Sequence, residues 1–201
     1  MPTCIISGVS EDLRENVLRL ILNAFANEAD TKIYLYEMEE KIGISYPDCL
    51  AAHTASEADA LISELANEFD RRSNEDEINY QKIVFCVNGF LGFYRGISQE
   101  SADILETLTR SGSNFNMFVY IVSNVEDLAF MMTFRDSIKS FDNCMKKGNA
   151  IAIGGNLMDY SGFDEIQDET DINFADYEGC LIHDDKITVL KFARIGVREN
   201  G

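Results

Sequence analysis

The sequence predicts a three-layer α/β domain with a mostly parallel central sheet, on three observations. Short apolar runs typical of buried strands alternate along the chain with longer amphipathic stretches typical of helices. The chain has 201 residues, of which 46% are hydrophobic, enough for one domain with a full-sized core. Near the end, the apolar runs Cys180–Ile182 and Ile187–Phe192 flank a polar tetrapeptide and predict a β-hairpin. We therefore expect residues 1–201 to form a single domain.

The composition excludes several classes of partner. The 17 basic and 35 acidic residues leave a formal net charge of −18, which repels nucleic acid and anionic lipid. No apolar run approaches the about 18 residues that a membrane-spanning helix needs. Five scattered cysteines without a Cys-x-x-Cys pair indicate reduced thiols in the cytoplasm. Met1-Pro2 leads directly into a core strand, as in a domain excised from a longer protein.

The elements are expected in a regular order. Thr3–Ser7 reads as a buried strand, Gly8 as a turn and Ser10 as the N-cap of an amphipathic helix. Thr54 and Glu57 match the capping box that opens a second helix. Further strands are expected at 32–36, 49–53, 83–87, 117–122 and 150–153. A further helix is expected at 98–110, one or two helices within 127–141, a charged turn at 37–41 and a solvated loop at 73–79. The strands at 4–7, 83–87 and 117–122 should be neighbours in the centre of the sheet.

The stretch from Gly8 to Glu15 has the length and context of the phosphate-loop pattern G-x-x-x-x-G-K-[ST], but not its chemistry. Leu13 stands where the second glycine would let backbone amides curl around phosphate. Arg14 keeps the positive charge of the lysine, whereas Glu15 replaces the hydroxyl that holds magnesium. The two acids before Leu13 add negative charge at the helix N-terminus, which would otherwise favour an anion. An ordinary βα unit that never bound phosphate is the alternative.

The order of these pieces resembles the RecA-like motor domains of the FtsK/SpoIIIE family. Val87-Asn88-Gly89-Phe90 looks like the Walker B element Val-Asp-Glu-Phe, with Asn88 for the Asp that organises magnesium and Gly89 for the Glu that activates water. Segments 134–143 and 148–155 look like the parts that follow. Within the family, the resemblance is strongest to the C-terminal degenerate ATPase domain of the EssC/EccC-type motor of type VII secretion. It implies a RecA-like P-loop NTPase fold.

Together with the lost residues, this resemblance implies a pseudo-ATPase domain that docks substrates or partners, or regulates neighbouring ATPase domains. Ordinary family members use ATP and magnesium; here we expect no cofactor, no catalytic residue and no metal site, although the parent protein would be an ATPase. The implied partners are the parent chain's neighbouring ATPase domains and a secreted protein with a helical C-terminal signal. The implied location is the cytoplasm at the inner face of the membrane, without insertion. Two alternatives stay open: a divergent ATPase in which Arg14 replaces the lysine, and an unrelated α/β regulatory module.

The segment Leu128–Phe134 carries more large apolar residues than one buried stripe needs. Methionine-rich faces adapt to partner helices, so Leu128, Phe130, Met131 and Phe134 are candidate anchors for a partner. Core packing is the alternative. The apolar segment Phe90–Tyr94 follows the carboxyl end of a strand, where ligands bind in such sheets, and otherwise reads as a loop packed on a helix.

Residues 159–185 contain ten acids and no Lys or Arg. A solvated acidic face is favoured over a cation site because the acids lack calcium-loop spacing. The candidates for such a site are Asp164, Glu165, Asp168, Glu169 and Asp171. The only histidines, His53 and His183, lie in no recognisable nucleophile motif, and we expect neither to be catalytic.

Overall fold

The computed structural model describes residues 3–39, 41–46, 48–75, 79–163, 171–183 and 186–195. Within these residues, one eight-stranded sheet has the order β3-β2-β4-β5-β1-β6-β7-β8. Every pair from β3 through β6 is parallel, whereas β7 and β8 add antiparallel to the β6 edge. The strands are β1 Cys4–Gly8, β2 Thr31–Tyr36, β3 Leu50–Ala52, β4 Lys82–Asn88, β5 Met117–Asn124, β6 Asn149–Asn156, β7 Asn173–His183 and β8 Lys186–Lys191.

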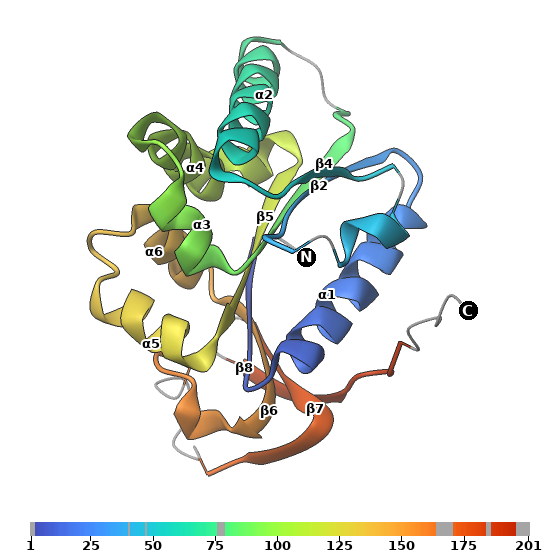
Figure 1. The fold of residues 1–201 in the computed structure, drawn as a ribbon, viewed down its shortest axis with the longest axis vertical. Coiled ribbons are helices and arrows are strands. Elements are labelled where there is room, and N and C mark those ends of the chain that lie inside the picture. The colour runs from blue at the N-terminus through green and yellow to red at the C-terminus, as the bar shows by residue number, and fades with distance from the viewer. Residues whose placement is uncertain are drawn as a thin grey trace.

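The helices cover both faces of this sheet, but unequally. In Figure 1, α1 lies on one face and α2 to α6 lie on the other. The helices are α1 Glu11–Ala26, α2 Ala55–Asn74, α3 Phe90–Gly96, α4 Gln99–Ser111, α5 Val125–Thr133 and α6 Lys139–Lys146. The described residues also form the 3₁₀ turns η1 Gly43–Ser45, η2 Gly112–Phe115 and η3 Leu157–Asp159. The predicted three-layer α/β fold is confirmed. No described helix has both the length and the apolar character needed to cross a membrane.

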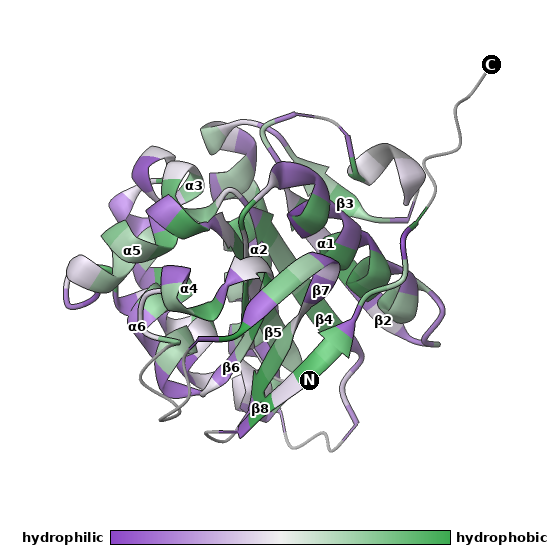
Figure 2. Cartoon of the chain, turned by 90° about the horizontal axis from the view of Figure 1, so that it is seen from below, coloured by the Kyte–Doolittle hydropathy of each residue, from purple (hydrophilic) through white to green (hydrophobic). Residues whose placement is uncertain are grey.

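The core consists of two apolar clusters, one on each face, which Figure 2 shows as green strands at the centre of the molecule. Successive side chains of a strand point to opposite faces. In β4, Phe85 and Val87 therefore join the cluster under α2 to α6, whereas Val84 and Cys86 join the cluster under α1. Burial on both faces explains why this strand is a continuous apolar run in the sequence.

The predicted strand neighbours and the terminal hairpin are both confirmed. β5 lies between β4 and β1, with Cys86 opposite Tyr120 and Cys4 opposite the same residue on the other side. β7 and β8 pair antiparallel, with Cys180 opposite Val189. The capping box at Thr54 is present, because its side chain accepts from the backbone N–H of Glu57 and the Glu57 carboxylate accepts from that of Thr54.

One local prediction is wrong, and one predicted turn has a buried residue. The segment Phe90–Tyr94 belongs to helix α3 rather than to a loop, because Gly89 takes a left-handed conformation (φ 78°) and turns the chain so that Phe90 and Phe93 are buried. The buried residue is Glu37, the first of the predicted charged turn at 37–41. Its side chain is buried, and its carboxylate accepts from the backbone N–H groups of Ile42, at 2.9 Å, and Gly43, at 2.7 Å. These bonds offset the cost of burying the charge.

The acidic stretch is only partly described. Asp164, Glu165, Asp168 and Glu169 lie outside the described residues. Asp171 is exposed, and one of its carboxylate oxygens accepts from the side-chain amide of Asn156. Among the residues that the structure describes, no three or more His, Cys, Asp or Glu side chains gather in a way that would hold a metal ion.

Candidate functional site at the carboxyl edge of the sheet

The parallel strands end at one edge of the sheet, where open α/β sheets bind ligands. Gly8 at the end of β1 lies opposite Asn124 at the end of β5. Asn88 at the end of β4 lies opposite Val122 on the other side of β5. The structure therefore brings the two sets of predicted positions, Gly8 to Glu15 and Asn88–Gly89, to the same edge with one strand between them.

The connection between β1 and α1 consists of Val9 and Ser10 alone. Ser10 is extended (φ −129°, ψ 154°), and its Oγ accepts from the backbone N–H of Leu13 at 3.4 Å. The N-cap predicted at Ser10 is thereby confirmed. A working phosphate loop would extend to position 13, whereas the structure has helix from Glu11 onward. A cap at Ser10 and a loop through Leu13 exclude each other, because a capped residue is followed directly by helical turns.

Apolar side chains of this turn pack against the end of β6. A Cβ added to Gly154 would lie 2.8 Å from Leu13 Cδ1, and one added to Gly155 would lie 2.6 Å from Val9 Cγ1. Both glycines have left-handed backbones, with φ of 72° and 68°. The hydroxyl of Tyr160 donates towards two carbonyls of the same strand end, those of Ile153 at 2.6 Å and Gly154 at 2.7 Å. Leu13, the residue in place of a loop glycine, thus takes part in the packing of this edge.

Arg14 points back to the end of β1. Its Nη1 donates to the carbonyl of Gly8 at 2.8 Å. Partial burial lowers the pKa of Arg14, while the nearby carboxylates of Glu11 and Asp127 act in the opposite direction. The guanidinium of Arg14 therefore already interacts with a carbonyl and with carboxylates of its own chain.

The acids beside Arg14 have different environments. Glu11 pairs with Lys41 at 2.8 Å, and this hydrogen bond lowers the pKa of Glu11. Burial raises the pKa of Glu15. Both carboxylates lie in the first turns of α1, where the free N–H groups and the dipole otherwise attract an external anion.

The predicted Walker B positions sit at a helix start. The backbone N–H of Gly89 donates to the carbonyl of Val122 at 3.1 Å, and Gly89 itself precedes α3. A Cβ at Gly89 would meet no atom within 4 Å, so only the left-handed backbone restricts this position. Asn88 is half-buried at the end of β4.

Sequence reasoning missed the contribution of β5 and α5 to this edge. Asn124 caps α5, with its Oδ1 accepting from the backbone N–H of Asp127 at 2.6 Å. Asp127 and Glu126 then lie close enough to Arg14 to influence its pKa. The signal was present as Asn124 followed three residues later by an acid, a variant of the capping pattern.

The candidate anchors on α5 divide between core and surface. Leu128 and Met131 are fully buried, which corrects their assignment as surface anchors: spaced three residues apart, they face the sheet. Phe130 and Phe134 are 38% and 48% exposed. Their ring centroids are 4.6 Å apart, and the guanidinium of Arg95 lies 4.7 Å from the centre of the Phe130 ring. These two phenylalanines, with Arg95, are called the Phe patch below.

The two histidines make structural contacts. Nδ1 of His53 lies 2.9 Å from the carbonyl oxygen of Glu37, and Nδ1 of His183 lies 2.6 Å from Oδ1 of Asn149. These contacts join β3 to β2 and β7 to β6.

Solved structures with a similar fold include domains of secretion ATPases. EssC (ATPases 2 and 3) from Geobacillus thermodenitrificans superposes with a TM-score of 0.80 at 15% identity, over 97% of this chain and 37% of that chain. The cytoplasmic domain of the type VII secretion ATPase EccC from Thermomonospora curvata gives 0.75 at 10% identity, over 98% and 24%. EccC (ATPases 2 and 3) from the same organism, in complex with a signal sequence peptide, gives 0.74 at 11% identity, over 98% and 37%.

These likenesses establish the RecA-like ATPase fold that the sequence predicted. This chain spans less than two fifths of each of the three structures. No protein-family model matches the sequence, and no curated protein matches it.

Proposed function

We propose that this chain is a domain of a type VII secretion motor that neither hydrolyses ATP nor binds MgATP tightly and that acts by docking partners. The observation that carries the proposal is the two-residue connection between β1 and α1. A phosphate loop needs several free backbone amides curled around the phosphates. Here the amide of Leu13 is capped by Ser10, and helix begins where that loop would curl.

The charges at this edge support the same proposal. A triphosphate approaching the start of α1 would meet the carboxylates of Glu11, Asp12 and Glu15. Like charges about 4–6 Å apart cost on the order of 1–4 kcal/mol per pair at intermediate dielectric. Arg14, the one cation in the pattern, is already bonded to Gly8.

The second half of a nucleotide site lacks its acids. The amide of Asn88 supplies no anionic charge to magnesium. Gly89 has no side chain to act as a base. ATP turnover would therefore need a carboxylate from elsewhere.

Isothermal titration calorimetry with MgATP tests the proposal. We expect no saturable binding in the micromolar range. A dissociation constant in the low micromolar range, about −8 kcal/mol, would refute the proposal.

A divergent ATPase is the second candidate function. It is favoured by Arg14 of α1, whose guanidinium lies beside the end of β1. In that case Arg14→Ala abolishes a measurable turnover. Under our proposal there is no turnover to lose, and Arg14→Ala only lowers the melting temperature, because the Gly8 carbonyl loses its donor. Arg19→Ala on the same helix is the control, since Arg19 donates to Ser45 and to the Lys41 carbonyl and not to the end of β1.

Restoring the lost residues separates side-chain loss from backbone change. A variant with five substitutions recreates the residue types of the two motifs. The substitutions are Leu13→Gly, Arg14→Lys, Glu15→Ser, Asn88→Asp and Gly89→Glu. We expect it to remain without micromolar MgATP affinity, because the cap at Ser10 still starts the helix at Glu11. Binding by a folded variant, checked by circular dichroism, would show that side chains alone were missing.

The docking part of the proposal rests on the Phe patch. One solved structure with this fold, EccC from Thermomonospora curvata, is in complex with a signal sequence peptide. We propose that this chain likewise meets a secreted protein with a helical C-terminal signal, or neighbouring ATPase domains of its parent chain, in the cytoplasm beneath the membrane. Exposed aromatic side chains supply much of the binding energy at such contacts.

The double variant Phe130→Ser, Phe134→Ser tests this surface. We expect it to weaken binding to the neighbouring ATPase domain of the parent chain, measured by calorimetry, by about tenfold or more. The control is Val189→Ser on β8, which removes an even more exposed apolar side chain elsewhere. Equal losses in both variants would contradict a specific role for the Phe patch.

A further inference from the structure

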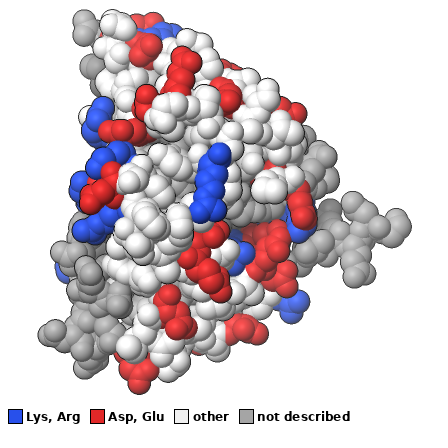
Figure 3. Space-filling model, turned by 60° about the vertical axis from the view of Figure 1, so that its left-hand side comes forward, with Lys and Arg blue, Asp and Glu red and all other residues white. Residues whose placement is uncertain are grey.

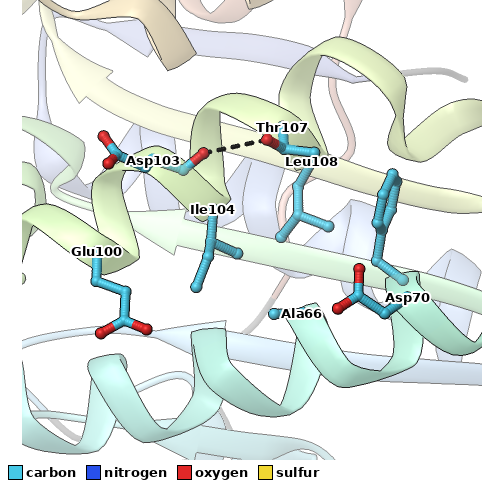
Figure 4. Close-up of a pocket in the computed structure, with 8 residues that line it drawn as sticks. Ala66, Asp70, Glu100, Asp103, Ile104, Thr107 and Leu108 are labelled. Atoms are coloured by element: carbon cyan, nitrogen blue, oxygen red, sulfur yellow. Dashed lines mark hydrogen bonds between the residues drawn. The ribbon is translucent and has the colours of Figure 1, made fainter.

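A groove of about 500 Å³ runs between α2 and α4, on helices other than those that form the Phe patch (Figure 4). The side chains that line it are Ala66, Phe69, Asp70, Glu100, Asp103, Ile104, Thr107 and Leu108. Neither the proposed loss of ATP hydrolysis nor the Phe patch accounts for it.

The floor of the groove is apolar. Ile104 and Leu108, one helical turn apart, point from α4 towards α2 in Figure 4, and Ala66 and Phe69 line it from α2. Such i, i+4 spacing is what an amphipathic helix matches with its own apolar side chains.

The walls are tied together near both ends. At the start of the two helices, the backbone N–H of Ser98 donates to Asp59 Oδ1 at 3.0 Å. Towards their ends, the rings of Phe69 and Phe115 pack edge to face at 5.1 Å, and Arg72 Nη1 donates to the Phe115 carbonyl at 2.7 Å. The groove is therefore preformed, which lowers the cost of binding.

The rim carries acids that the chain leaves without cations. Three other acids of these helices are paired: Glu64 with Lys32, Glu68 with Arg71 and Arg72, and Glu106 with Arg110. In the described part of the chain, no ion pair includes Asp70, Glu100 or Asp103, all of which are exposed.

The carboxylates of Glu100 and Asp70 point into the gap from opposite helices and near opposite ends of it (Figure 4). Figure 3 shows acidic side chains spread over a mostly uncharged surface on the side of the molecule that carries α3, α4 and α5, with most of the basic side chains gathered towards its left edge.

We propose that this groove binds a basic amphipathic helix of a partner protein. Two apolar side chains of the partner helix, four residues apart, cover Ile104 and Leu108, and a Lys or Arg one turn beyond each of them meets Glu100 or Asp70. Glu100 and Leu108 are eight residues apart on α4, about 12 Å along the axis. The first cation and the second apolar residue of the partner helix are also eight residues apart. A second copy of the chain is the wrong occupant, because its net charge of −18 opposes the acidic rim.

Fluorescence anisotropy with the full chain tests the inference. The probe is a labelled peptide of about 18 residues, with two Leu four residues apart and a Lys one turn outside each, on an Ala/Gln background. The matched peptide has Glu in place of both Lys. We expect the Lys peptide to bind about tenfold tighter or more. Failure of both peptides to bind at about 0.5 mM, or equal affinities, would overturn the inference.

A charge-swap variant locates the binding. The double variant Asp70→Lys, Glu100→Lys should bind the Lys peptide about fivefold more weakly and the Glu peptide more tightly than the original chain does. Asp48→Lys, Asp176→Lys changes two exposed acids outside the groove by the same charge and should leave the preference for the Lys peptide intact.

Three results would contradict this assignment. One is an equal effect of both variants, which would mean that net charge alone acts. Another is unchanged binding of the Lys peptide to the charge-swap variant. The third is that analytical ultracentrifugation detects a dimer of the original chain but only a monomer of the charge-swap variant, because the groove would then bind a second copy of the chain.

Discussion

The side chain of Arg72 is only 1% exposed, yet three oxygen atoms surround its guanidinium. Glu68 Oε1 accepts from Nε at 2.7 Å, and Nη1 donates to the carbonyls of Gln81, at 2.8 Å, and Phe115, at 2.7 Å. The ring of Tyr80 lies 5.1 Å from the guanidinium carbon. A single charge thereby joins the end of α2 to the segments that enter β4 and β5.

Replacing Arg72 with Ala should therefore lower the free energy of unfolding by about 3–5 kcal/mol, because two carbonyls lose their donor and Glu68 loses one of its two arginine partners. Arg71→Ala is the matched control on the adjacent residue. Arg71 is 44% exposed and pairs with Glu68 and Glu75, so its loss should cost about 1 kcal/mol or less. Urea denaturation measures both. Equal losses would show that Arg72 is no more important than a surface cation.

Glu68 makes the stability that comes from these ion pairs depend on pH. Hydrogen bonds from Arg71, and then Arg72, lower the pKa of Glu68 from 4.5 to about 2 in the folded chain. The ionised carboxylate thus adds stability that is fully present above pH 4.5 and is lost as the pH falls towards 2. We expect Glu68→Gln to flatten the decline of the melting temperature over this range. A decline as steep as in the original chain would contradict the assignment.

At the scale of elements, the turn between β1 and α1 is fixed by its packing on β6. Gly154→Ala should be costly twice over, because φ is 72° and the new Cβ would lie 2.8 Å from Leu13 Cδ1. We expect a loss of about 2–4 kcal/mol in the free energy of unfolding. Gly89→Ala isolates the backbone part, since φ is 78° there and no atom lies within 4 Å of the added Cβ.

Gly89→Ala should accordingly cost about 1–2 kcal/mol. Chemical denaturation of the two variants measures the difference. If Gly154→Ala is no worse than Gly89→Ala, Leu13 is not held tightly against β6.

The elements that the sequence predicted well are those whose pattern has one physical meaning. β4 and β5 are apolar on both faces, and the Thr54 box has both of its partners within one turn. α3 was missed because glycines before and within it suggest a loop. Gly89, however, only turns the chain before the helix, and buried Phe90 and Phe93 hold the helix on the core.

In α5 the sequence showed an excess of apolar residues but not their direction. Leu128 and Met131 form one face and enter the core, and Phe130 and Phe134 form another and stay at the surface. Only packing against the sheet decides between two faces that are both apolar.

At the scale of the whole molecule, the adjacency of β4, β5 and β1 followed from burial, but the shape of the candidate site did not. Pattern matching aligned Gly8 to Glu15 by spacing, which carries no information on where a helix starts. The cap at Ser10 did carry that information and was itself predictable. Long-range contributions, such as Asp127 beside Arg14, come from strand order and lie beyond any local pattern.

The net charge of −18 leads to a prediction for the molecule as a whole. Like charges repel more strongly in the compact state than in the unfolded chain, and salt screens them, with a Debye length of about 10 Å at 0.1 M and 3 Å at 1 M. We expect the melting temperature to rise by about 2–8 °C between about 0.02 and 0.5 M NaCl, which corresponds to about 1–2 kcal/mol.

The variant Asp48→Lys, Asp176→Lys serves as the control for this effect, because it reduces the net charge from −18 to −14 without touching the groove. It should be more stable than the original chain at low salt and should gain less from added NaCl. Salt also strengthens apolar burial, but that contribution is the same in both proteins and cancels in the comparison. A melting temperature that falls with salt would instead mean that ion pairs such as Lys32–Glu64 and Arg71–Glu68 outweigh the repulsion.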